Sequence, residues 1–112
     1  MSDILQELDQ ALEARKSESA DSSYVASLYS KGLEKILKKV SEEAAETVMA
    51  AKDLEHQNSQ ENKDHLVYEI ADLWFHTMVL LASQDLSSKD ITTELQRRFG
   101  LSGHEEKASR ES

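Results

Sequence analysis

The segment LEKILKKVSEEAAETVMAAKDLEH, residues 33–56, decides the fold. It contains no proline and no glycine, and its apolar and small side chains recur about every 3.6 residues, which predicts one long amphipathic helix. The stripe that we expect to pack against other helices consists of Leu33, Ile36, Leu37, Val40, Ala44, Thr47, Val48, Ala51 and Leu54. A helix of this length is stable only when such a stripe is covered, so the segment predicts a helical bundle.

The rest of the chain supports an all-α fold. The 112 residues include no proline and three glycines, and they suffice for a single domain over residues 1–112. Helical spacing predicts a first helix capped by Ser2 or Asp3, a short helical segment at 24–29, a helix after a turn at 56–64 that runs to about residue 84, and a last helix at 88–99 closed by Gly100. We therefore expect an antiparallel bundle of four to five helices, followed by a polar tail at 101–112.

Charge and composition argue against several classes of function. The formal net charge of −9 opposes general nucleic-acid binding, which needs a basic face to displace phosphate counterions. The longest uninterrupted apolar run, residues 78–82, is far short of the ~20 residues that span a bilayer. No signal peptide is evident, and the absence of cysteine excludes disulfides and thiolate metal sites. We expect a soluble cytoplasmic protein without a membrane partner.

Five carboxylates form the most distinctive pattern, Glu42-Glu43-x-x-Glu46 followed by Glu69-x-x-Asp72. Residues three apart lie on one face of a helix, where like charges cost about 0.2–0.5 kcal/mol per pair unless they are neutralised. Two helices joined by a short turn pack antiparallel, which brings the two acidic segments level. A hard divalent cation, which prefers oxygen ligands, would neutralise them, so the pattern predicts a metal site.

The alternative is a solvated acidic face, which is common in a chain with 22 acidic residues. The second acidic segment favours a site, because His65, Glu69, Asp72 and His76 form a single stripe that flanks the apolar face of its helix. A di-iron bundle site is disfavoured, because it needs two Glu-x-x-His pairs and the expected bundle helices supply none. His76 stays open between a packing residue and an outer-shell partner of the carboxylates.

A lysine cluster precedes the first acidic segment: Lys31, Lys35, Lys38 and Lys39. Lys35 and Lys39 lie eight and four residues before Glu43 and so line the same helix face. Ordinary ion pairs along the helix would explain them. Beside an acidic metal site, they instead favour binding of a polyphosphate, whose charge they would offset.

These motifs together resemble a known family. The acidic spacing is similar to that of the all-α nucleotide pyrophosphohydrolases, the MazG-like superfamily. Within it the chain resembles the phosphoribosyl-ATP pyrophosphohydrolases, on the following segments: Ser23-Tyr24, Ser27-Leu28 and Lys31-Gly32; Lys35-Ile36 and Lys38-Lys39-Val40-x-Glu42-Glu43-Ala44-x-Glu46; Glu69-x-Ala71-Asp72-Leu73-x-x-His76; and Arg97-Arg98 with Ser102-Gly103-x-Glu105-Glu106-Lys107-Ala108-Ser109-Arg110. The lysine block and the tail are the segments that favour this family over the wider superfamily.

The resemblance implies an activity and a set of site residues. The reaction would be metal-dependent hydrolysis of 1-(5-phosphoribosyl)-ATP to 1-(5-phosphoribosyl)-AMP and pyrophosphate, the second step of histidine biosynthesis. The implied roles are as follows: Glu43, Glu46, Glu69 and Asp72 would bind Mg²⁺ or Mn²⁺, Lys31, Lys35, Lys38 and Lys39 the triphosphate, and Lys107, Ser109 and Arg110 in the tail would close over the substrate. Glu42 would be a further ligand, a base that activates water together with Glu43, or a residue of the helix surface.

The resemblance also implies partners and leaves rivals. We expect a homodimer or higher homo-oligomer, with Trp74 and Phe75 as exposed apolar residues of a helical interface, and a cyclohydrolase as a partner in trans. One alternative is a housecleaning pyrophosphatase for free nucleoside triphosphates, which would use the same site. Another is a helical adaptor without catalytic activity, whose acidic patches bind a basic partner.

Overall fold

The computed structural model describes residues 3–99, and within them the chain is all-α. The helical segments, in chain order, are α1 Ile4–Ala14, the 3-10 turn η1 Arg15–Ser17, α2 Tyr24–Lys31, α3 Leu33–His56, α4 Gln60–Ser83 and α5 Ser88–Arg98. Five α-helices in this part of the chain confirm the predicted fold class. The bounds of α3 are those predicted from the apolar periodicity.

Local hydrogen bonds explain where the helices begin. Asp3 accepts from the backbone N–H groups of Leu5 and Gln6, and Ser23 caps α2 in the same manner. Helix α4 begins at Gln60, five residues earlier than the predicted turn at 56–64 allows, because Ser59 accepts from the backbone N–H of Asn62 and starts the helix there. Only three residues, 57–59, therefore separate α3 from α4.

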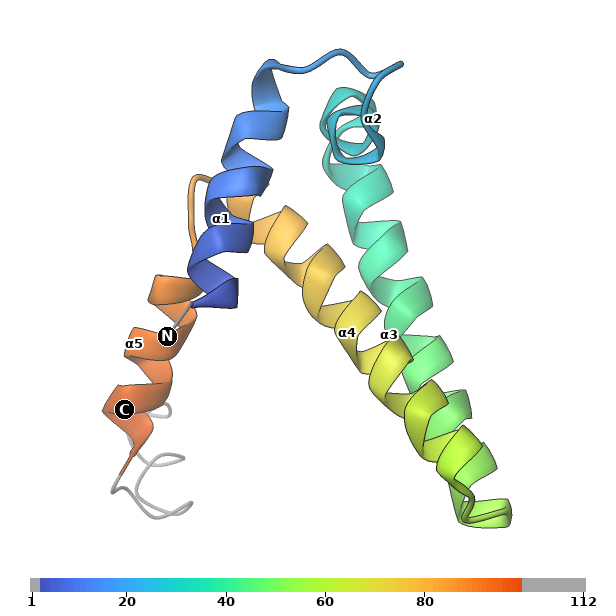
Figure 1. Cartoon of the computed structure of the whole chain (residues 1–112). Coiled ribbons are helices and arrows are strands. Elements are labelled where there is room, and N and C mark those ends of the chain that lie inside the picture. Colours follow the sequence, from blue (N-terminus) through green and yellow to red (C-terminus); the bar gives the residue numbers. More distant parts are fainter. Residues whose placement is uncertain (1–2, 100–112) are drawn as a thin grey trace.

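The junction between α2 and α3 depends on one glycine. Gly32 has a φ of 94° and a ψ of −178°, a conformation that is essentially restricted to glycine. It ends α2 by donating its N–H to the carbonyl of Leu28, and α3 starts at the next residue. The chain can therefore turn sharply without a loop, which places α2 across the first turns of α3 (Figure 1).

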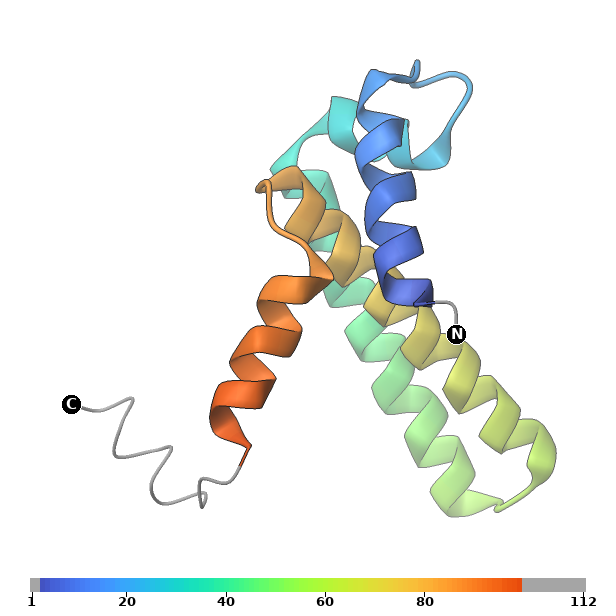
Figure 2. The ribbon, with the colours of Figure 1, turned by 60° about the vertical axis from the view of Figure 1, so that its left-hand side comes forward.

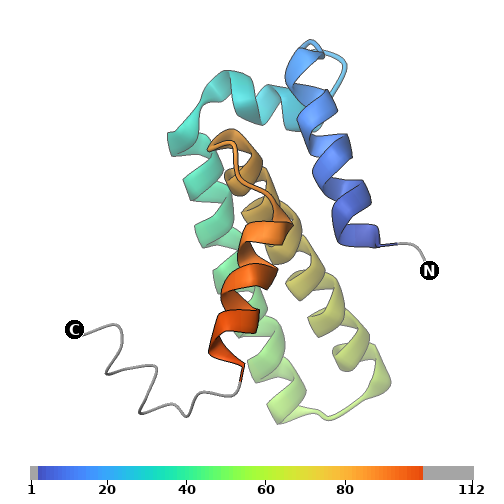
Figure 3. The ribbon, with the colours of Figure 1, turned by 90° about the vertical axis from the view of Figure 1, so that its left-hand side faces the viewer.

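Helices α3 and α4 form a long antiparallel hairpin, and the other helices lie around one end of it. Figures 1 and 2 show α1 and α2 near the start of α3 and the end of α4, with α5 leaving from the end of α4, whereas the tip of the hairpin extends away from α1 and α2. In Figure 3 the hairpin is seen with α5 in front of it and α1 beside it. Among residues 3–99, no further helix lies over the half of the hairpin that includes the α3–α4 turn in Figure 1.

The main core lies at the covered end. It is formed by buried side chains from α1, α2, α3 and α4: Leu12, Val25, Leu28, Ile36, Met78, Val79 and Ala82. Tyr29 closes this core by donating its hydroxyl to the carbonyl oxygen of Leu12 at 2.9 Å. The core fixes α1 and α2 onto the hairpin, and with them the first turns of α3.

The expectation that the whole apolar stripe of α3 is packed is wrong for this single chain. Ile36 is buried, but Val48 is 61% exposed and Ala51 and Leu37 are exposed as well. The buried positions of α3 are Ile36, Glu43 and Ala50, seven residues apart. The stripe that faces α4 thus includes a glutamate, and Val48 lies on the half of the hairpin that no other helix covers.

Helix α4 also differs from expectation. Its most buried residues include Glu69 and His76, so two members of the polar stripe that we expected to flank the apolar face are buried, whereas Asp72 is half-buried and His65 is exposed. Trp74 is 58% exposed, as predicted for an interface residue, whereas Phe75 is not exposed and packs against the main core. By length and hydropathy α4 is the one helix in residues 3–99 that could cross a bilayer, a test that core helices of soluble bundles also pass. Because α4 carries Glu69 and His76 on its buried side, we interpret it as a bundle helix, consistent with a soluble protein.

The burial pattern predicts unequal effects of two isoleucine substitutions. Ile36 is 2% exposed and Ile4 is 68% exposed. Ile36→Ala should lower the free energy of unfolding by about 2–5 kcal/mol, because it leaves a cavity between α2, α3 and α4. Ile4→Ala, the matched control, should change it by less than about 0.5 kcal/mol. Urea unfolding at one fixed protein concentration measures both, and equal losses would contradict this description of the core.

Candidate metal centre

The middle turns of α3 and α4 bring four carboxylates into one cluster. Glu43 and Glu46 of α3 meet Glu69 and Asp72 of α4, and one oxygen of each lies within 4.8 Å of the others. The antiparallel hairpin with its short turn aligns these positions, as the sequence predicts. Thr47, whose hydroxyl lies 3.4 Å from the carbonyl oxygen of Glu69, connects the two helices at this level. Their role as metal ligands stays a prediction.

Two of these carboxylates are buried without sufficient partners. The side chains of Glu43 and Glu69 are 4% and 11% exposed, and the Oε2 atom of each has no hydrogen-bond partner. Burial of an ionised carboxylate without compensation is costly, and here two face each other. A divalent cation with oxygen ligands would satisfy both orphaned oxygens at once, so the residues present fit Mg²⁺ or Mn²⁺.

The electrostatics of the cluster agree with this interpretation. Burial, followed by hydrogen bonding with Glu43 and repulsion from its charge, raises the pKa of Asp72 above its usual value. Without a cation, proton sharing between these two side chains is the available way to reduce the repulsion. A cation would replace that proton and let both groups act as ionised ligands.

Lys39 provides the positive charge nearest to the cluster. Its Nζ lies 3.3 Å from Oε2 of Glu42 and 3.4 Å from Oε1 of Glu43. Burial alone would lower the pKa of Lys39, but the hydrogen bonds to Glu42 and Glu43 and the nearby Tyr24 raise it overall. Lys39 is therefore a cation at the edge of the carboxylate cluster.

The other predicted site residues of α3 lie farther out. Glu42 is half-buried and pairs with Lys39, so it borders the cluster without belonging to the four-oxygen group. Lys31 and Lys38 are exposed and Lys35 is partly buried. The structure brings Lys39 to the carboxylates, while Lys35 and Lys38 lie on the first turns of α3 and Lys31 is the last residue of α2.

Two histidines and one tyrosine complete the surroundings. His65 lies with Nε2 3.1 Å from Oε1 of Glu69, and buried His76 lies beside Asp72. Tyr24, at the start of α2, places its hydroxyl 2.9 Å from Nε2 of His76. The sequence did not identify Tyr24 as a site residue from spacing, because it is 52 residues from His76; its only signal was the resemblance of the Ser23-Tyr24 pair.

Comparison with known proteins agrees with this site. The model of the family described as phosphoribosyl-ATP pyrophosphohydrolase matches residues 5–99. The chain belongs to this family. Relatives named phosphoribosyl-ATP pyrophosphatase include one from Hydrogenovibrio crunogenus, 70% identical over 108 residues that cover 96% of this chain and 93% of the relative. A second, from Methylococcus capsulatus, is 58% identical over 96% of both chains, and a third, from Vesicomyosocius okutanii, is 56% identical over 98% of both.

Part of the predicted site lies outside the described residues. The tail residues Lys107, Ser109 and Arg110, and the expected helix cap Gly100, fall beyond residue 99. The match to the phosphoribosyl-ATP pyrophosphohydrolase family also ends at that residue. Closure of the tail over substrate therefore stays a prediction.

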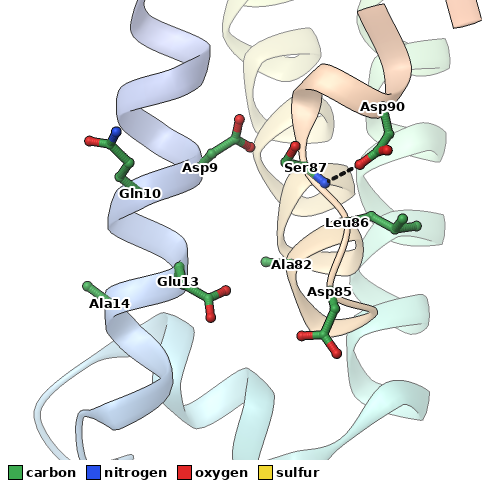
Figure 4. Close-up of a pocket in the computed structure, with 9 residues that line it drawn as sticks. All are labelled: Asp9, Gln10, Glu13, Ala14, Ala82, Asp85, Leu86, Ser87 and Asp90. Atoms are coloured by element: carbon green, nitrogen blue, oxygen red, sulfur yellow. Dashed lines mark hydrogen bonds between the residues drawn. The ribbon is translucent and has the colours of Figure 1, made fainter. Parts of the chain in front are cut away.

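A second acidic pocket lies between α1 and the α4–α5 connection, and its acids serve the fold. Figure 4 shows Asp9, Glu13, Asp85 and Asp90 around it. Asp90 accepts from the Ser87 N–H in a capping box, Asp9 accepts from Ser88, and Lys16 pairs with both Glu13 and Asp85. These bonds join α1 to the start of α5. These carboxylates are thus partnered, whereas Oε2 of Glu43 and Oε2 of Glu69 between α3 and α4 have no hydrogen-bond partner.

The raised pKa of Asp72 yields a prediction for metal-free protein. A carboxyl with a higher pKa in the folded state binds its proton more tightly there, so its contribution to the free energy of unfolding decreases as pH rises through the usual aspartate pKa to the raised value. Asp72→Asn should remove this component and make the metal-free protein more stable than wild type at neutral pH. Urea unfolding with a chelator across that pH range measures it, with exposed Asp21→Asn as control. Identical pH dependence in wild type and Asp72→Asn would contradict the prediction.

Proposed function

We propose that this protein is a hydrolase that converts 1-(5-phosphoribosyl)-ATP to 1-(5-phosphoribosyl)-AMP and pyrophosphate, the second step of histidine biosynthesis. The observation that carries the proposal is the family match over residues 5–99 together with the buried carboxylate cluster inside that range. The names of relatives up to 70% identical favour this activity over housecleaning of free nucleotides. The adaptor alternative leaves the orphaned, buried oxygens without a purpose.

A divalent cation, Mg²⁺ or Mn²⁺, is the proposed cofactor. Glu43, Glu46, Glu69 and Asp72 would hold it, since their oxygens already lie together. When bound, it would supply a Lewis acid for the phosphate oxygens and lower the pKa of a bound water. Exposed Glu46 borders the buried pair, so the cluster opens to solvent on that side and can admit a phosphate.

The side chains around the cluster would position the reacting groups. Lys39 would offset charge on the departing pyrophosphate, with Lys31, Lys35 and Lys38 available to the more distant phosphates. Glu42, which borders the cluster and is 43% exposed at its side chain, can accept a proton from an attacking water that Glu43, 4% exposed, cannot reach as readily. We therefore favour Glu42 over Glu43 as the base. Cleavage between the α and β phosphates would release pyrophosphate.

The tail supplies the third part of the proposed mechanism. Lys107, Ser109 and Arg110 add two cations and a hydroxyl group to a chain of net charge −9, which suits contacts to phosphate or to the phosphoribosyl group. Their resemblance to the family's tail supports a role in closing over substrate and excluding water. The activity belongs to the cytoplasm in this proposal, where a cyclohydrolase in trans would take the product.

A second copy of the chain would complete the bundle. Val48, Met49, Val67 and Tyr68 are each at least 60% exposed, and by their positions in α3 and α4 all four lie on the half of the hairpin that includes the turn, which no other helix within residues 3–99 covers. Farther along α4, a groove of about 480 Å³ beside α1 and α5 includes exposed Trp74 among its largely apolar lining. Apolar surface of this extent indicates an interaction surface, so we propose a homodimer or higher oligomer.

Removal of single carboxylates tests the activity. Glu46→Ala and Asp72→Ala should each reduce pyrophosphate release from freshly prepared phosphoribosyl-ATP by at least ~100-fold, while helical content is kept. Residues that only hydrogen-bond to a metal ligand already contribute about 10–100-fold, and a residue that binds the metal directly matters more. Glu55→Ala, at an exposed glutamate of α3, is the control. Near-normal turnover of either variant would refute the metal assignment. Release from free nucleotides alone, measured in parallel, would assign the housecleaning activity instead.

Charge placed on the uncovered hairpin tests the oligomer. Val48→Glu combined with Val67→Glu should convert the protein to a monomer, because the glutamates would be buried in the interface. Light scattering coupled to size-exclusion chromatography measures the molar mass. Ile4→Glu, at a position of α1 that is 68% exposed, should leave this mass unchanged. A wild-type mass of one chain, 12.6 kDa, would contradict the proposal.

A further inference from the structure

His76 has both ring nitrogens in hydrogen bonds although it lies beside the carboxylate cluster. His76 is 4% exposed. Its Nδ1 lies 2.9 Å from the carbonyl oxygen of Asp72, and its Nε2 lies 2.9 Å from the hydroxyl of Tyr24. The ring also contacts Tyr24 and Phe75 edge-on, with centroids 5.9 and 5.3 Å apart. Its orientation is thus determined from several sides.

The chemistry of these partners defines the tautomer. A carbonyl oxygen only accepts hydrogen bonds, so Nδ1 must carry the proton. In the neutral ring Nε2 then holds a lone pair and accepts from the Tyr24 hydroxyl. Tyr24 is 53% exposed, and among residues 3–99 its hydroxyl has no hydrogen bond other than the one with His76.

The two bonds lead to different parts of the site. On one side, Nδ1 donates to the carbonyl oxygen of Asp72 at 2.9 Å and lies 3.5 Å from Oδ1 of the same residue. This contact holds the α4 turn that carries Asp72, a proposed metal ligand. On the other side, the bond holds Tyr24 at the first residue of α2. The ring of His76 therefore joins α2 to the turn of α4 that presents Asp72.

We propose that His76 is a positioning residue that holds the α4 turn of Asp72 through the proton on Nδ1 and fastens α2 to this turn through Tyr24. Hydrogen bonds behind metal ligands restrict their orientation and typically matter 10–100-fold for affinity or activity. His76 and Tyr24 have this role without touching the cation or the substrate.

The competing assignment is His76 as a metal ligand. One ring nitrogen lies within 4.8 Å of oxygens of Glu43 and Asp72, so distance alone permits it. Ligation would require one ring nitrogen to give up its hydrogen bond, either to the Asp72 carbonyl or to Tyr24. The four-carboxylate group needs no such rearrangement, which favours the positioning role.

The tautomer is measured first, on metal-free protein. Long-range ¹⁵N–¹H NMR of histidine-labelled protein should show a proton on Nδ1 of His76. Comparison with the His76→Gln spectrum assigns its signal among the four histidines. A proton on Nε2 with none on Nδ1 would overturn the inference. This result does not depend on the proposed activity.

Two isosteric variants then separate the two bonds. In His76→Asn the amide nitrogen stands where Nδ1 was and can still donate to Asp72, whereas in His76→Gln the amide stands where Nε2 was and can still accept from Tyr24. We expect His76→Gln to weaken Mn²⁺ binding by about tenfold, and His76→Asn to leave it nearly unchanged, measured by electron paramagnetic resonance of free Mn²⁺. Equal Mn²⁺ affinity of wild type and His76→Gln would overturn the positioning of Asp72.

Tyr24→Phe tests the second bond. It should lower the melting temperature of the metal-free protein in the wild type but add nothing in the His76→Asn background, because there the hydrogen bond is already lost. Independent, additive effects would overturn the link to α2. Coupling of an imidazole nitrogen to bound Mn²⁺ in electron spin echo spectra, present in wild type and lost in both His76 variants, would instead show ligation and refute the positioning role.

The Mn²⁺ measurements rest on the proposed metal-dependent activity. A failure of that proposal can be distinguished from a failure of the positioning role of His76. A wild-type protein that binds no Mn²⁺ would refute the proposed cofactor. In that case the tautomer and the Tyr24–His76 coupling, both measured without metal, would still decide whether His76 joins α2 to α4.

Discussion

The burial of two carboxylates between α3 and α4, each with one oxygen that has no hydrogen-bond partner, is the constraint on which the rest of the structure depends. Glu43 occupies a position that a helix hairpin would normally fill with an apolar residue, midway between Ile36 and Ala50, and it faces Glu69 across the interface. Such an arrangement weakens the folded state unless a cation or a shared proton compensates it. The chain keeps it where a metal would be used, which is how catalytic sites depart from the rules of a well-packed core.

The remaining helices support this hairpin unequally. The apolar core of α1, α2 and the covered end of the hairpin fixes one side of the carboxylate cluster, and Gly32 allows α2 to cross α3 immediately before the site begins. The other half of the hairpin is supported only by contacts between α3 and α4. Stability supplied at one end and apolar surface left open at the other are consistent with assembly from more than one chain.

Comparison of prediction and structure shows where helical periodicity stops being informative. It located α3 to the residue, because propensity and spacing act locally. It was wrong about the burial of Val48 and Ala51, which are exposed in the single chain. An amphipathic pattern indicates which face of a helix is apolar, but it does not indicate whether the same chain or another chain covers that face. It also placed Glu69 and His76 beside the apolar face. The structure buries these two residues, because the acidic sides of α3 and α4 face each other across the carboxylate cluster.

The sequence by itself determined the all-α class, the bounds of α3 and the spacing of the five carboxylates, because helix propensity and the 3.6-residue repeat act over a few residues. The family, and with it the chemistry, also follows from the order of residues. Only the tertiary structure decided that Glu43 and Glu69 are buried with one orphaned oxygen each, that Glu42 stays at the border, and that Tyr24 reaches His76. These contacts depend on how far helices separated by tens of residues rotate and slide against one another. That geometry results from the packing of all side chains together, and no local pattern encodes it.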